Sequence, residues 1–230
     1  MKELPILFSA AMVRAIMAGT KTQTRRVVRK QFEADAIVAE VPAITPEGWQ
    51  VSGHSGRWWD DASANLDDAV PCPYGRPGDR LWVRESFRIG EDLGAGWEPW
   101  MSTGDRFVAY DSPAADEYCV PADYTIPRNA REVHNCEGTD EHWRSFGPIP
   151  SIHMPRWASR ITLEITGVRV ERLQDISEAD AQAEGVKHSL HLPGGRFARE
   201  NFAHLWWTIN GDGAWEANPW VWVVTFRRLP

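Results

Sequence analysis

The chain has 230 residues, of which 43% are apolar and 25% charged, and it carries a formal net charge of −7. This length is enough for one large domain or two small ones with a buried core. The negative charge argues against a protein that coats nucleic acid through bulk charge, because such binding needs many contacts between Lys or Arg and phosphate. The 13 tryptophans predict that some line a cleft, although core packing is the commoner role of large aromatic side chains.

No stretch approaches the roughly 20 apolar residues of a membrane-spanning helix, and the N-terminus lacks the pattern of a signal peptide. The three cysteines fit a reducing compartment better than a disulfide framework. We therefore expect a cytoplasmic protein with no membrane partner. The sequence leaves the oligomeric state open.

Hydrophobic periodicity and turn residues predict many short strands and few helices. In chain order, the predicted elements are a strand at residues 4–8, a helix at 10–18, strands at 25–29, 80–85, 106–110 and 158–173, helices at 177–185 and 196–210, and a strand at 220–226. Two long stretches, at about 31–73 and 88–155, are rich in Pro and Trp and are expected to be irregular insertions. The first also has the pattern of a hairpin around residues 49–51.

This order of elements indicates an α+β protein, and we expect one domain, 1–230, built as a small mixed β-barrel with flanking short helices. Within the strand at 80–85, Leu81 and Val83 share one face and Trp82 and Arg84 the other. Gly167 predicts a bend in the strand at 158–173. The helix at 196–210 is amphipathic, with a predicted buried stripe formed by Ala198, Phe202, Leu205, Trp206 and Ile209.

Residues 18–26 (AGTKTQTRR) form a polar corner between the first helix and the next strand. A desolvated lysine can take the proton of a hydroxyl nucleophile, so Lys21 and Thr24 form a candidate catalytic pair. Residues three apart in a strand face opposite sides. The pair therefore requires a turn over residues 21–24, with the strand starting only at about Arg25. The alternative is a solvated polar loop.

The insertions also contain metal-binding residue types, namely His54, Cys72, Cys119, His134, Cys136 and His142. None of them has the paired C-x₂-C spacing of a structural zinc site. The chain contains no glycine-rich phosphate loop, no G-x-S-x-G and no H-E-x-x-H motif. We expect neither a metal nor a cofactor.

Several blocks of the sequence, in this order, resemble the ASCH domains of the PUA-like superfamily. Residues 16–24 (IMAGTKTQT) are similar to the L-x-G-x-K-T-x-T signature, and residues 78–83 (GDRLWV) to the G-D-x-L-x-V strand. Residues 163–168 (LEITGV) with 173–184, and the closing 220–226 (WVWVVTF), resemble the later blocks. The chain looks like the longer ASCH proteins of phages and prophages, which implies a bacterial or phage-infected host cytoplasm.

The resemblance implies a PUA-like barrel and, from small ASCH enzymes, an amidohydrolase acting on N4-acetylcytidine or a related N-acylated pyrimidine nucleoside. By motif, Lys21 is the general base, Thr24 the nucleophile and Glu184 the carboxylate partner. Arg25, Arg26, Glu85 and Trp82 are expected to contact the substrate. The Glu178 carboxylate is expected to serve in a helix cap instead.

Two departures from the small enzymes keep other functions open. The long Trp- and Pro-rich insertions are absent from compact ASCH hydrolases, and Arg25 stands where those enzymes tend to be apolar. One alternative is a non-catalytic module that binds RNA or a modified base through aromatic and arginine side chains. A further alternative is a ribonuclease in which Lys21 and nearby arginines stabilise charge on phosphorus.

Overall fold

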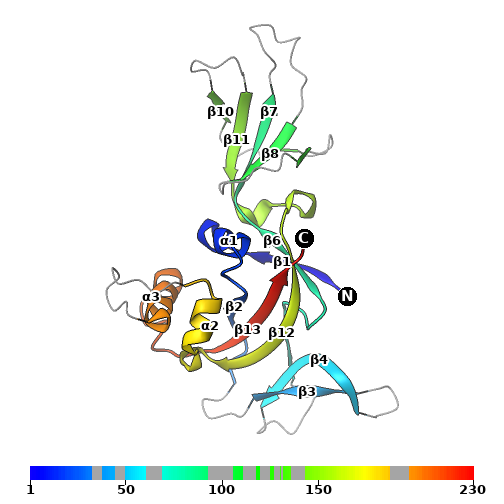
Figure 1. The fold of residues 1–230 in the computed structure, drawn as a ribbon, viewed down its shortest axis with the longest axis vertical. Coiled ribbons are helices and arrows are strands. Elements are labelled where there is room, and N and C mark those ends of the chain that lie inside the picture. The colour runs from blue at the N-terminus through cyan, green and yellow to red at the C-terminus, as the bar shows by residue number, and fades with distance from the viewer. Residues whose placement is uncertain are drawn as a thin grey trace. The chain divides into compact units, whose positions relative to one another are not determined.

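The computed structural model (Figure 1) describes residues 1–32, 38–44, 50–60, 69–92, 106–110, 118–119, 125–126, 130, 132–135, 143–186 and 197–230. The chain divides into two compact units. The first contains Met1–Leu4, Ala15–Leu81 and Thr162–Pro230, and the second contains Pro5–Arg14 and Trp82–Ile161. The single domain expected from the sequence stays a prediction.

A five-stranded sheet has the order β1-β6-β12-β13-β2. Its strands are β1 (Glu3–Leu7), β6 (Arg80–Arg84), β12 (Thr162–Arg172), β13 (Trp220–Arg228) and β2 (Gln23–Val27). The two edge strands, β1 and β2, do not pair with each other, so among the described residues the sheets are not closed into a barrel. The protein is mixed α+β, as predicted, but the described strands do not close into the predicted small β-barrel, and the PUA-like fold stays a prediction.

The long curved strands β12 and β13 form the centre of the sheet (Figure 1). Their antiparallel register shifts between Ile165 and Gly167, which is a β-bulge at the bend that the sequence predicts. Most side chains of β13 are buried, as its nearly continuous apolar run predicts. The register of β2 against β13 places Gln23 opposite Thr225, Thr24 opposite Val224 and Arg25 opposite Val223.

Helices α2 (Glu178–Ala183) and α3 (Ala198–Asn210) lie beside β13 (Figure 1). A buried apolar cluster joins them to it, formed by Leu173, Ile176, Ala181, Ala198, Phe202, Trp206, Val221 and Val223. The predicted stripe of α3 is correct at Ala198, Phe202 and Trp206 but wrong at Ile209, which is 56% exposed. Asn201 is buried instead, because the buried face turns toward α2 and β13 and leaves the last turn in solvent.

Two side-chain caps fix the helix starts. The Ser177 hydroxyl accepts a hydrogen bond from the Asp180 backbone N–H at 3.1 Å and caps α2. Glu178 does cap a helix, but that helix is α3: its carboxylate accepts the backbone N–H groups of Ala198 at 2.6 Å and Arg199 at 3.0 Å. A carboxylate at a helix N-terminus satisfies free N–H groups and complements the helix dipole.

The first insertion is less irregular than predicted. Strands β3 (Val38–Ile44) and β4 (Gln50–Asp60) pair antiparallel, and β4 also pairs with β5 (Val70–Pro71). The expected hairpin near residues 49–51 therefore exists and is much longer than the sequence pattern indicates. The Trp58 ring meets Trp222 of β13 edge-on, with ring centroids 4.9 Å apart.

The second unit contains a further five-stranded sheet, in the order β10-β11-β7-β8-β9. Its strands are β7 (Phe87–Asp92), β8 (Arg106–Tyr110), β9 (Tyr118–Cys119), β10 (Glu132–Asn135) and β11 (Trp143–Ile149). Of these, the sequence predicts only β8. The expectation that 88–155 is irregular is wrong for these strands, because antiparallel pairing and a core of Phe87, Ile89, Ile149, Met154 and Ala158 order them.

Helix α1 (Ala10–Met17) is followed by Gly19, whose φ of +70° is the left-handed conformation predicted for the residue that closes the helix. Within the described part of the chain, no helix has both the length and the apolar character needed to cross a membrane.

Candidate functional site

One face of the segment entering β2 is polar although it is buried. Lys21, Gln23 and Arg25 alternate along this extended segment, so their side chains leave the same side of the chain. That side faces α2 and α3, because Arg25 lies opposite Val223, a member of the apolar cluster between β13 and the two helices. All three side chains are nearly inaccessible to solvent. Such burial is tolerated only if each polar group has a partner.

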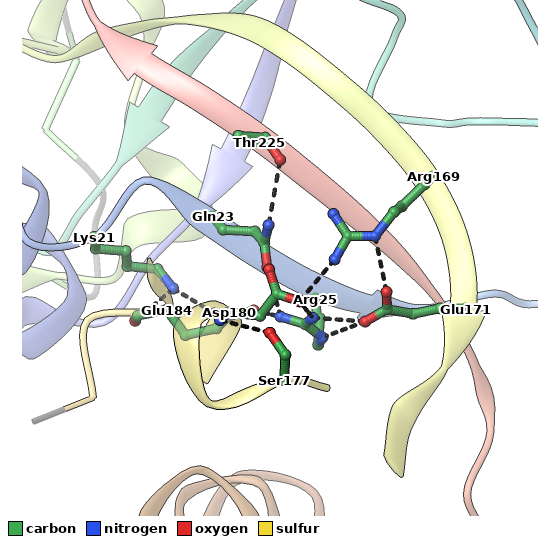
Figure 2. A network of polar contacts seen from close by, with 9 residues as sticks. All are labelled: Lys21, Gln23, Arg25, Arg169, Glu171, Ser177, Asp180, Glu184 and Thr225. Carbon is green, nitrogen blue, oxygen red and sulfur yellow. Dashed lines mark hydrogen bonds and ion pairs between the residues drawn. The ribbon is translucent and has the colours of Figure 1, made fainter. Parts of the chain in front are cut away.

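Lys21 meets Glu184, which follows the last residue of α2 (Figure 2). The Lys21 Nζ atom donates to the Glu184 Oε2 atom at 2.6 Å and to the Glu184 carbonyl oxygen at 2.9 Å. The Lys21 side chain is 0% exposed and that of Glu184 4%. Their backbones also form an isolated antiparallel bridge. Gly185 permits this close approach, because a Cβ atom there would lie 3.0 Å from the Cβ atoms of Ala15 and Lys21.

Arg25 is the hub of the remaining contacts (Figure 2). Its Nη1 atom donates to Gln23 Oε1 at 2.7 Å and lies 3.3 Å from Glu184 Oε1. Its Nη2 atom lies 2.5 Å from Glu171 Oε1 and 3.4 Å from Asp180 Oδ2. A guanidinium group has five N–H donors in a planar fork, and here the fork is shared among carboxylates from α2 and β12.

Arg169 closes the network from the neighbouring strand (Figure 2). Its Nε atom donates to Glu171 Oε2 at 2.8 Å, and its Nη2 atom donates to Asp180 Oδ2 at 3.0 Å. The bulge in β12 sets the register that puts Arg169 opposite Val223 and Glu171 opposite Val221, on the helix-covered face. We call the six charged side chains the Lys21–Glu184 cluster, and they comprise Lys21, Arg25, Arg169, Glu171, Asp180 and Glu184.

The cluster holds three cations and three carboxylates, so its formal charge balances. Burial is the largest effect on Lys21 and lowers its pKa below the ordinary lysine value, although the charge and hydrogen bond of Glu184 raise it. For Asp180, burial raises the pKa, but the Ser177 hydrogen bond and the charges of Arg169 and Arg25 outweigh it and hold the pKa low. The cluster thus combines a lysine whose pKa is lowered with a carboxylate, that of Asp180, whose pKa is also held low.

The structure brings Lys21 and Glu184 together, as the resemblance implies, but it does not bring Thr24 to them. The strand begins at Gln23, two residues before the predicted start at about Arg25, and Lys21 is already extended in its bridge with Glu184. No turn therefore forms over residues 21–24. Thr24 is 2% exposed and shares its face with Val224, on the side of the sheet away from Lys21.

The expected substrate-contacting residues take different places. Arg25 belongs to the Lys21–Glu184 cluster. The Arg26 side chain leaves the opposite face of β2. Burial raises the pKa of Tyr74, and the charge of Arg26 opposes this shift in part. In the second unit, Glu85 forms a two-pronged pair with Arg160, at 2.9 and 3.1 Å.

Trp82, also in the second unit, is 8% exposed and lies under the Arg84 guanidinium at 4.7 Å. These two residues share a face, as the sequence predicts. Among the described residues, no group of three or more His, Cys, Asp or Glu could hold a metal ion. Cys136 and His142 lie outside the described residues.

Sequence reasoning missed four members of the network, which are Gln23, Arg169, Glu171 and Asp180. A signal for Arg169 and Glu171 is present in the sequence, because polar side chains recur at nearly every second position of the otherwise apolar stretch 162–171. That pattern is typical of a solvated sheet face, and only the covering helices turn it into a buried network.

The chemistry available to this cluster is proton transfer. A buried amine with a lowered pKa has a larger neutral fraction and can accept a proton, and a carboxylate at 2.6 Å can hold or pass it on. Perturbed titrating groups gather at functional sites, although structural networks also perturb them. Searches among protein families, curated proteins and solved structures gave no match to this chain.

Proposed function

We propose that this protein is a metal-independent amidohydrolase of the PUA-like ASCH type, which removes the acyl group from N4-acetylcytidine or a related N-acylated pyrimidine nucleoside. One observation carries the proposal: the buried Lys21 amine donates to the Glu184 carboxylate at 2.6 Å. These are two of the three residues to which the ASCH resemblance assigns catalysis, as general base and carboxylate partner. The sequence blocks that resemble ASCH domains support the substrate class.

In the proposed reaction the neutral Lys21 amine takes a proton from a water molecule, whose oxygen bonds to the acyl carbon. The bond from the acyl carbon to the exocyclic nitrogen then breaks, and the proton passes from Lys21 to that nitrogen. The products are the free nucleoside and the carboxylic acid. Glu184 orients the amine throughout. We assign the nucleophile to water because Thr24 lies on the other face of β2.

Access to Lys21 is the main physical demand of this proposal. The Lys21 side chain is 0% exposed, and its Nζ atom is buried in contact with Glu184. A substrate can reach the amine only if the residues around Glu184 move, so the proposal requires that α2 shifts from β2 when the nucleoside binds.

The same burial fits a non-catalytic protein, and our second proposal is therefore the module that binds RNA or a modified base, which rests on the ASCH resemblance. A fully paired cluster that merely fastens α2 to β2 needs no access to solvent. The geometry gives less support to a ribonuclease, because the Arg25 guanidinium, which would stabilise charge on phosphorus, is already shared among three carboxylates.

Incubation with N4-acetylcytidine, with cytidine release followed by liquid chromatography, tests the proposal. We expect Lys21→Met to lower kcat by about 10²- to 10⁴-fold, the usual contribution of general acid–base catalysis. The kcat of Thr24→Val should stay within about threefold of that of the unmodified protein. This substitution replaces a hydroxyl on the far face of β2 by a methyl group of similar size and leaves the proton-transfer pair intact. Lys30→Met, which removes an exposed lysine, is the matched control.

Because Lys21→Met also destabilises the fold, rates are compared only at temperatures where circular dichroism shows every variant folded. Undetectable cytidine release by the unmodified protein, or an unchanged rate in Lys21→Met, would refute the amidohydrolase proposal. Binding of an acetylated oligonucleotide without turnover would support the second function. A large loss in Thr24→Val would restore Thr24 as the nucleophile.

A further inference from the structure

A second site lies in the first unit, in a pocket of about 310 Å³. The pocket is lined by Met1, Lys2, Arg57, Pro71, Cys72, Gly75, Arg76 and Asp79. None of these residues belongs to the Lys21–Glu184 cluster. We propose that this pocket binds a phosphate monoester through Lys2, Arg57 and Arg76.

The charge of the lining carries this inference. Among the described side chains that line the pocket, those of Lys2, Arg57 and Arg76 are basic and that of Asp79 is a carboxylate, so the described lining has a net charge of +2. The whole chain has a net charge of −7, so the described lining of this pocket is opposite in sign to the protein as a whole. A phosphate monoester carries about −1.5 to −2 at pH 7 and therefore balances the lining.

The carboxylate in the described part of the lining already accepts hydrogen bonds from the protein backbone. Asp79 is 5% exposed, and its two oxygens accept the backbone N–H groups of Lys2 at 2.7 Å and Arg76 at 3.2 Å. It therefore fastens the chain start and the 72–79 turn, which carry two of the three cations, to each other. The wall is close-packed, because a Cβ atom at Gly75, which has a φ of +101°, would lie 3.0 Å from Asp79 Oδ2.

The third cation comes from the neighbouring sheet. Arg57 of β4 pairs with Pro71 of β5, and its Nη2 atom donates to the Ala69 carbonyl at 3.5 Å, which orients the guanidinium. Cys72, on the same side, adds no negative charge, because burial raises the pKa of its thiol to about 12. The cations of Lys2, Arg57 and Arg76 thus come from three separate stretches of chain. An arginine guanidinium can donate two parallel hydrogen bonds to two oxygens of one phosphate group, which suits a site with two arginines.

The volume favours a small ligand over a bare ion. Ligand pockets in proteins typically measure about 300–1,000 Å³, and this one, at about 310 Å³, lies at the lower end. It has room for a phosphate group and the sugar that bears it. The inference does not depend on the amidohydrolase proposal, because it concerns a different set of residues.

Isothermal titration calorimetry on the full chain tests the pocket with four probes, which are cytidine 5′-monophosphate, ribose 5-phosphate, cytidine and inorganic phosphate. We expect both monoesters to bind, and cytidine and inorganic phosphate to bind at least tenfold more weakly. The variant Arg57→Gln/Arg76→Gln should weaken monoester binding at least tenfold. Both arginines are exposed, so the variant keeps its fold. Arg227→Gln, which removes an arginine that is 65% exposed and pairs with Glu164, is the matched control and should stay within twofold.

Binding should also weaken as salt rises from 50 to 200 mM, since the contacts are ionic. Three results would overturn the inference. They are no monoester binding at millimolar concentration, equal affinity for cytidine and its monophosphate, and equal losses in Arg57→Gln/Arg76→Gln and Arg227→Gln. Inorganic phosphate binding as tightly as the monoesters would overturn the assignment to a monoester.

Discussion

The contact between Lys21 and Glu184 gives the sharpest test of how the site is built. The two side chains are 0% and 4% exposed, so removal of either partner leaves the other buried without its main counter-charge. Breaking a buried ion pair in this way costs about 3–5 kcal/mol. We expect Lys21→Met near the lower end of that range, because Arg25 still lies 3.3 Å from Glu184 and compensates it in part.

Glu184→Gln should show a distinctive dependence on pH. It removes the negative charge that raises the pKa of Lys21 and weakens the hydrogen bond that does the same, so burial lowers that pKa further. Between the folded-state pKa of Lys21 and its higher unfolded value, the unfolded state binds more protons, and stability therefore rises with pH. The penalty of Glu184→Gln should accordingly shrink as the pH rises toward the ordinary lysine range. Lys21→Met has no amine and should lack this recovery.

The double variant Lys21→Met/Glu184→Met completes the cycle. It removes one charge of each sign and leaves the remaining four charged groups balanced, and an apolar replacement of a buried ion pair is often close to neutral. We expect it to lie within about 2 kcal/mol of the unmodified protein, because the pair is replaced by packing. The sum of the two single losses should exceed this value clearly, since contacting residues are coupled.

Hydrogen exchange of the β13 amides is the suitable assay, because β13 belongs to the first unit and pairs directly with β2, so its amides report the opening free energy of the sheet that holds the pair. Two results would refute this reasoning. One is that both single variants lie within about 1 kcal/mol of the unmodified protein, the level of an ordinary surface ion pair. The other is a double variant whose loss equals the sum of the single losses, which would mean that the two side chains do not stabilise each other.

Three further predictions concern other parts of the first unit. Glu178→Gln should lower the opening free energy of α3 by about 1 kcal/mol, because it weakens the cap of that helix. As a control, Glu200→Gln within the helix should change the opening free energy by less than half as much. Hydrogen exchange of the α3 amides measures both. Gly185→Ala and Gly211→Ala both place a side chain at positive φ, but only the Cβ atom at position 185 meets neighbouring atoms at 3.0 Å. The melting temperature should therefore fall further in Gly185→Ala than in Gly211→Ala. Equal shifts would contradict the crowding at Gly185. Burial raises the pKa of Asp79, but hydrogen bonds to its carboxylate outweigh it and hold the pKa low. The contribution of Asp79 to stability is therefore present above the ordinary carboxyl pKa and is lost as the pH falls through the lowered folded-state pKa. Urea titrations should show a smaller penalty for Asp79→Asn at pH 3 than at pH 7.

The sequence alone determined much of the framework of the main sheet. Local patterns placed the five strands of that sheet and the helices at or within a few residues of their observed positions, because apolar periodicity and turn residues act over short stretches of chain. The left-handed Gly19 and the bend near Gly167 followed from the same local chemistry. Apart from β8 and the hairpin near residues 49–51, the strands within the insertions were not predicted, because their Pro-, Gly- and charge-rich sequences become strands only through pairing with other strands.

The tertiary structure decided which side chains meet. Lys21 and Glu184 are 163 residues apart in the sequence, and nothing in either local pattern specifies their contact. The resemblance to ASCH domains suggested this pair, whereas the partners of Arg25 depend on the register of β12, β13 and β2 and on the helices that cover them. The start of β2 at Gln23 had the largest consequence, because a strand's side chains alternate and a shift in where it begins decides that Thr24 faces away from Lys21.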